Sequence, residues 1–281
     1  MIISNRGRNS WSKFTSVAAT LVILLLMPLL GRAESIGAWA RTRIEIKAAH
    51  KAAEEALANP NVTPKERLRV EQMYYQLVRD NPQSVPAQNA LAAFLSKTGK
   101  PEAAVEHWQT AQRLEPKNGE AASSLGGAYL RIGRVREAAD QFLLAVRSES
   151  GNPDYHFDLG NVEFILRRDL TAAWKIDSAE LLQRALFQFR EASRLAPTDR
   201  EYARAYAETF YGMPNPDWNE AQVAWQHYLE LSTNRTFAYL QLARVSLKRH
   251  NKAEALSFLN KISDPSFSEI KEKLRKQAEA L

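Results

Sequence analysis

A spacing of 34 residues recurs in the middle of the chain and constrains its fold more than any other feature. Leu91, Leu125 and Leu159 lie 34 residues apart, and each is followed by a small residue. Further positions repeat at the same spacing between the units that begin near residues 85 and 119: Gly99 with Gly133, Ala104 with Ala138, Trp108 with Phe142, and Ala111 with Ala145. A fixed period of about 20–50 residues is the signature of a repeat protein, in which each unit is one supersecondary element stacked on the next.

The spacing inside one unit predicts two helices. Within residues 119–152, the positions whose small or large size recurs between units fall on one stripe of each helix. These are Leu125, Gly126 and Tyr129 on the first helix, and Ala138, Phe142 and Ala145 on the second. Gly133 lies between them, where a left-handed residue that ends a helix is favoured. No stretch alternates apolar and polar residues for long enough to predict a strand, so we expect an all-α protein.

This pattern of small and large residues resembles the tetratricopeptide repeat. The resemblance is strongest over residues 85–152, and it continues with changes to residue 265. It implies a right-handed α-solenoid of about six stacked antiparallel helix pairs. The fold class expected is therefore an all-α solenoid of the tetratricopeptide type.

The segments around the regular repeats are expected to modify the solenoid. Residues 34–84 predict a degenerate N-terminal helix pair, and residues 85–265 the repeats themselves. Ala138 and its equivalent Ala185 are 47 residues apart, which indicates an insertion of about 13 residues near 166–177. Residues 266–281 predict a charged amphipathic helix that caps the open end of the stack.

Residues 1–33 are typical of a secretory signal peptide. Basic residues precede an apolar stretch, Val17–Leu30, and the small residues Gly31 and Ala33 stand at the positions that signal peptidase requires. The stretch is shorter than the roughly 20 residues that span a bilayer as a helix. We expect export to the periplasm or the extracellular space. The alternative is a signal anchor, in which Val17–Leu30 is retained and ties the chain to the membrane.

Composition and motifs argue against catalysis, cofactors and nucleic acid. The chain has no Cys, and its five His residues show no metal-ligand spacing. There is no nucleophile elbow and no glycine-rich phosphate loop. The net charge of +6 depends on the four basic residues of 1–33, because the rest of the chain has 34 Lys and Arg against 32 Asp and Glu. We expect no metal, no cofactor and no nucleic-acid partner.

The resemblance also implies where a ligand binds. In the family, peptides lie along the concave face and contact first-helix residues that do not touch the core. On this chain the candidates are Asn89, Lys97, Ser123, Arg131, Phe157, Asn161, Phe164 and Arg204. Ala93 and Gly127 stand where a carboxylate clamp of the family has polar residues, which disfavours recognition of a C-terminal carboxylate. Phe157 and Phe164 either line a groove beside Asn161 or pack against the inserted segment.

The insertion contains one further candidate, Trp174. A large amphipathic residue in a segment that interrupts the repeat is suited to anchor an interface, or to fold back over the repeat as a plug. The function expected is a non-catalytic, exported scaffold that binds a protein or peptide and assembles a bacterial envelope complex. The alternatives are a membrane-anchored assembly factor and an enzyme with a site in the solenoid concavity.

Overall fold

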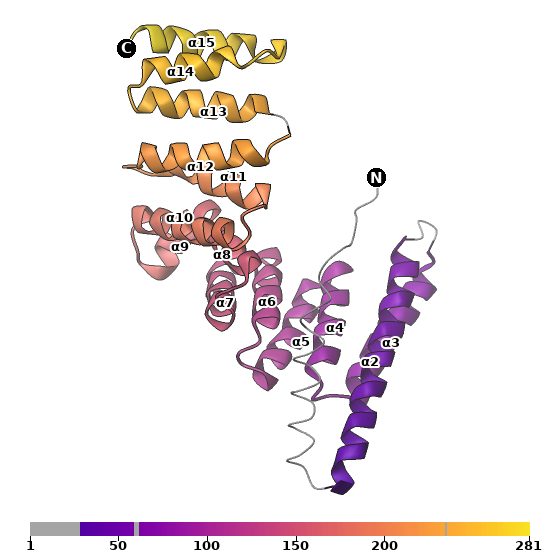
Figure 1. The fold of residues 1–281 in the computed structure, drawn as a ribbon. Coiled ribbons are helices and arrows are strands. Elements are labelled where there is room, and N and C mark those ends of the chain that lie inside the picture. The colour runs from indigo at the N-terminus through magenta and orange to yellow at the C-terminus, as the bar shows by residue number, and fades with distance from the viewer. Residues whose placement is uncertain (1–28, 59–61, 234) are drawn as a thin grey trace. The chain divides into compact units, whose positions relative to one another are not determined.

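The structure, a computed structural model, describes residues 29–58, 62–233 and 235–281 (Figure 1). Within these ranges the chain is helical and contains no strand, so the all-α prediction is confirmed. The described chain forms two compact units, with the boundary between Phe94 and Leu95. The predicted signal segment lies largely outside the described residues, although helix α2 begins at Leu29, inside it. No helix in the described ranges is long and apolar enough to cross a membrane.

The first unit contains α2 (Leu29–Ala58), α3 (Pro64–Asp80) and most of α4 (Val85–Lys97). Helices α2 and α3 pack against each other and occupy the segment predicted as the N-terminal pair (Figure 1). Thr63 begins α3 with a capping box, because its hydroxyl accepts from the Glu66 amide and the Glu66 carboxylate accepts from the Thr63 amide. Tyr74 of α3 is buried, and its ring stacks on Phe94 at 4.7 Å between centroids.

The second unit is a stack in which each helix contacts the next along the chain (Figure 1). Such nearest-neighbour packing is the organisation of a repeat protein. Its regular helices are α5 (Pro101–Leu114), α6 (Gly119–Arg131), α7 (Val135–Ser148), α8 (Pro153–Ile165), α10 (Ser178–Leu195), α11 (Arg200–Thr209), α12 (Trp218–Leu231), α13 (Arg235–Lys248) and α14 (Lys252–Asn260).

Small residues on first helices face large residues on second helices, as the 34-residue pattern predicts. A Cβ atom on Gly126 of α6 would lie 3.0 Å from the Phe142 ring of α7. A Cβ atom on Gly160 of α8 would lie 2.9 Å from the Phe189 ring of α10. In these two pairs, α6 with α7 and α8 with α10, the helices therefore approach closely because the glycine positions lack a side chain. Gly133, in the turn between α6 and α7, has a φ of 75°, which suits glycine.

The insertion predicted near 166–177 forms a short helix, α9 (Arg167–Trp174), which contacts α7, α8 and α10. Lys175 ends it in the left-handed conformation, with a φ of 55°. Asp177 then caps α10 by accepting a hydrogen bond from the Ala179 amide. Leu170 is the buried residue of α9, so the insertion packs on the repeats through one apolar side chain near its middle.

Helix α15 (Ser268–Glu279) follows a short 3₁₀ helix and packs on α13 and α14 at the C-terminal end of the stack. Leu274 and Ala278 are its buried residues, and its other side chains are charged, polar or partly exposed. Lys252 of α14 donates to the Glu279 carbonyl oxygen at 2.8 Å. This helix occupies the segment predicted to cap the stack.

Candidate functional site

The eight residues predicted for the concave face are distributed over both units. Asn89 lies in the first unit, half-buried on α4, and its Oδ1 is buried without a hydrogen-bond partner among the described residues. Lys97, at the end of α4, belongs to the second unit and is exposed. The other six predicted residues lie on α6, α8 and α11.

Three of these six side chains bond or pack to a neighbouring first helix. Arg131 of α6 donates to the carbonyl oxygen of Ser96 at 3.1 Å and also bonds the Ser96 hydroxyl. Ser123 of α6 donates to Oδ2 of Asp158 on α8 at 3.2 Å. The Phe157 ring of α8 lies 4.8 Å from the Tyr202 ring of α11. These contacts join successive repeats, so these side chains stabilise the stack as well as lining its surface.

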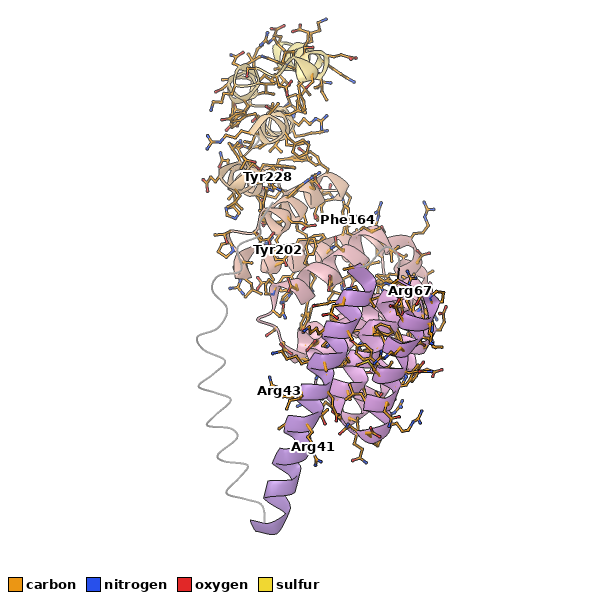
Figure 2. The ribbon with its side chains drawn as sticks, turned by 90° about the vertical axis from the view of Figure 1, so that its right-hand side faces the viewer. Arg41, Arg43, Arg67, Phe164, Tyr202 and Tyr228 are labelled. Atoms are coloured by element: carbon orange, nitrogen blue, oxygen red, sulfur yellow. The ribbon has the colours of Figure 1, made fainter. Side chains whose placement is uncertain are left out.

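Phe164 and Arg204 also contact other side chains of the second unit. The Phe164 ring lies 6.4 Å from the Phe189 ring and under the Arg167 guanidinium at 5.8 Å. Phe164 of α8 and Tyr202 of α11 are both labelled in Figure 2. Arg204 pairs with Glu208 at 2.8 Å. Phe164 therefore contacts the inserted helix through Arg167, but its aromatic contact is with α10.

A surface over α6 and α8 combines predicted residues with others that the sequence did not single out. On α6, residues Glu120, Ser123 and Gly127 follow one another at helical spacing, and on α8 so do Asp154, Asp158 and Asn161. The bond between Ser123 and Asp158 joins the two rows into one continuous surface, which we call the α6–α8 face. Asn161 is half-buried and makes no side-chain hydrogen bond with the residues the structure describes.

Burial, together with neighbouring carboxylates, raises the pKa of two groups on or beside the α6–α8 face. Burial raises the pKa of Asp158, the hydrogen bond from Ser123 opposes this shift, and the charge of Asp154 adds to it. Burial also raises the pKa of the Tyr202 hydroxyl, which donates to Asp154. Sequence reasoning missed Asp154 and Asp158 because isolated acidic residues on a helix usually lie on a solvated face.

Trp174, the candidate in the insertion, lies against the repeats. Its indole Nε1 donates to Oδ1 of Asp140 on α7 at 3.1 Å. The Arg184 guanidinium of α10 lies 4.8 Å from the centre of its ring and 2.6 Å from Oε1 of Glu163 on α8. This is the arrangement expected if Trp174 folds back over the repeat. Trp174 and its neighbours thus connect α9 to the three helices that it contacts.

Glu163 is a buried carboxylate that sequence reasoning also missed. None of its surface is exposed, and neither of its oxygens accepts an aligned hydrogen bond, although Arg184 lies close. Burial raises the pKa of Glu163 to about 7, and the charge of Arg184 opposes this shift only in part. Within the described ranges, no group of three or more His, Cys, Asp or Glu residues is arranged to hold a metal ion.

The fold is similar to that of solved tetratricopeptide proteins, although no family model and no curated protein sequence matches the chain. YrrB, described as a TPR protein with an unusual peptide-binding site, is 20% identical, with a TM-score of 0.56 over 74% of this chain and 98% of YrrB. PilF of Pseudomonas aeruginosa is 16% identical, with a TM-score of 0.53 over 85% of this chain and 98% of PilF. These likenesses confirm a tetratricopeptide-like fold.

Proposed function

We propose that the protein is a non-catalytic interaction scaffold that binds a protein or peptide on the α6–α8 face. The observation that carries this proposal is Asn161, a half-buried amide at the end of the α8 row, with which no described side chain or backbone group forms a hydrogen bond. An amide offers one acceptor and two donors, which match the carbonyl and amide groups of a peptide main chain. The likeness to YrrB, described as having a peptide-binding site, also supports a peptide ligand.

The contacts between neighbouring helices support a rigid binding surface. Ser123 is bonded to Asp158, and Arg131 to Ser96, before any ligand arrives. A receptor whose side chains are already held loses little conformational entropy on binding, so more of the interaction energy appears as affinity. The face therefore suits a scaffold that brings partners together without changing its own structure.

Site-specific photocrosslinking in cells tests the binding face. A photoreactive amino acid at position 161 is expected to give a defined adduct with a partner protein. The matched control is position 183 on α10, where Gln183 is an exposed amide outside the face. Adducts from position 183 alone, or no adduct from either position, would contradict binding on the α6–α8 face.

We further propose that the chain is exported and acts in assembly of a bacterial envelope complex. The arrangement of basic, apolar and small residues in 1–33 supports the export. Cell fractionation with mass spectrometry tests it. Cleavage predicts a mature chain outside the cytoplasm that is about 3–4 kDa lighter than the full chain. A full-length, membrane-bound chain would favour the signal anchor instead, and a full-length chain in the cytoplasm would exclude export.

A further inference from the structure

Gly127 lies in the interior of α6, and the packing of the protein gives no reason for a glycine there. A Cβ atom built on Gly127 meets nothing within 4 Å. By contrast, Gly126 and Gly160 face phenylalanine rings, and a Cβ on Gly119 would lie 2.8 Å from Tyr155. Glycine inside a helix is unfavourable relative to alanine, because it loses more backbone freedom on folding. A glycine with open space above it leaves the helix backbone accessible to close approach by another chain.

The open position at Gly127 is the last of the α6 row of the α6–α8 face. Ser123 stands one turn before it on α6 and bonds Asp158 of α8. Asn161 follows Asp158 by three residues, so its amide lies on the same side of α8. The accessible backbone of α6 and the Asn161 amide of α8, which bonds no described residue, therefore belong to one surface. A main chain lying on Gly127 would run beside an amide able to pair with it.

The charge of this surface indicates what kind of chain fits. Glu120, Asp154 and Asp158 of this face form no ion pair with any residue that the structure describes. Neither does Glu149, which ends α7 and lies close to Gly119 at the start of α6. Burial, with the charges of Glu149, Glu120 and Asp154, raises the pKa of Tyr155 to about 12. Elsewhere in the unit arginines pair with carboxylates: Arg190 with Glu220, Arg204 with Glu208, and Arg249 with Glu254. Arg131, four residues after Gly127 on α6, is an exposed cation at the opposite end of this row, and it bonds Ser96 rather than any of these carboxylates. The end of the face that carries Glu120 and Asp154 therefore has negative charge that the described residues leave uncompensated.

We propose that the α6–α8 face binds an extended, basic peptide segment of a partner protein, whose main chain lies directly on α6 at Gly127. A peptide group of the segment pairs with the Asn161 amide. Lysine or arginine side chains of the segment pair with Glu120, Asp154 and Asp158. Their charge-assisted hydrogen bonds add the positive charge that the neutral donors Ser123 and Tyr202 do not bring to Asp158 and Asp154. This inference rests on the proposed function and specifies the chemistry of its ligand.

Selection from a randomised peptide library tests the proposal, with the full chain as bait. We expect the selected peptides to be enriched in lysine and arginine. One selected peptide, labelled with a fluorophore, then serves as the probe for anisotropy titrations. Asp154→Asn with Asp158→Asn is expected to weaken its binding at least about tenfold, the loss expected for one or more charge-assisted contacts. The control, Glu102→Gln with Glu106→Gln on exposed positions of α5, removes the same charge and is expected to leave the affinity unchanged.

Variants at Gly127 test the contact with the main chain. Gly127→Ala is expected to raise the thermal unfolding midpoint, since alanine favours helix, and yet to weaken binding of the probe peptide. Gly127→Leu is expected to abolish binding while the protein stays folded. Equal affinity of both variants and the wild type would overturn the close approach at Gly127. Selection of acidic or uncharged peptides, or equal effects of the two double variants, would overturn basic-segment recognition alone. Selection of no peptide would overturn the proposed peptide binding as well.

Discussion

Replacing Glu163 with Gln should change how the stability of this protein depends on pH. Glu163 is fully buried, and its pKa of about 7 lies above the value of 4.5 for an unperturbed glutamate. The folded state therefore binds this proton more tightly than the unfolded state. The stabilisation from protonated Glu163 is fully present below pH 4.5 and is lost as the pH rises through about 7. At about 1.4 kcal/mol per pH unit, this interval corresponds to about 3 kcal/mol.

Urea unfolding of wild type and Glu163→Gln across pH 4.5 to about 8 measures this effect. The glutamine does not titrate, so the difference in unfolding free energy should shift in its favour by up to about 3 kcal/mol as the pH rises. Arg184 is partly exposed and reaches solvent, so the variant does not leave a buried cation unpaired. The control is Glu180→Gln at an exposed position of α10. Parallel pH profiles for wild type and Glu163→Gln would refute the reasoning.

Two further predictions concern neighbouring glycines and the inserted helix. Gly126→Ala is expected to lower the unfolding free energy by about 1–3 kcal/mol, since its Cβ would lie 3.0 Å from Phe142, whereas Gly127→Ala should raise it by up to about 1 kcal/mol. Denaturant titration measures both, and equal effects would contradict the packing. Trp174→Phe removes the donor to Asp140 and is expected to lower the unfolding free energy by about 1 kcal/mol. Asp140→Asn keeps an acceptor for the indole and should lower the unfolding free energy by less. The reverse order, read by the same titration, would argue against this bond.

Much of the fold was predictable because two independent features of the repeat indicate the same helix pairs: the 34-residue spacing, and the alternation of small and large side chains at the repeated positions. The small residue at Gly126 and the large one at Phe142 report a contact between two helices that are adjacent in the chain. Short connections leave such helices few ways to pack, so a local pattern is enough to predict each pair. The same reasoning extends to Gly160 and Phe189, even though α9 interrupts the sequence between them.

The candidate site was predictable only as a face. Helical spacing indicates which side chains share a side of α6 or α8, and it groups Ser123 with Gly127 on α6. Helical spacing does not indicate which of these side chains already contact a neighbouring repeat. The bond from Ser123 to Asp158 and the tilted ring contact of Phe157 with Tyr202 join residues 35 and 45 positions apart. Such contacts depend on how neighbouring repeats are positioned relative to each other, and the sequence of a single helix does not determine that position.

The sequence by itself determined the all-α repeat, the position of the insertion and the order of the helices, because these follow from local periodicity and from residues that begin or end a helix. Only the tertiary structure decided the surroundings of Trp174 and Glu163. Trp174 donates to Asp140 of α7, and Arg184 of α10 lies between Trp174 and Glu163 of α8. Burial of a carboxylate and pairing of a distant indole require four helices to come together, and that arrangement arises only when the chain packs.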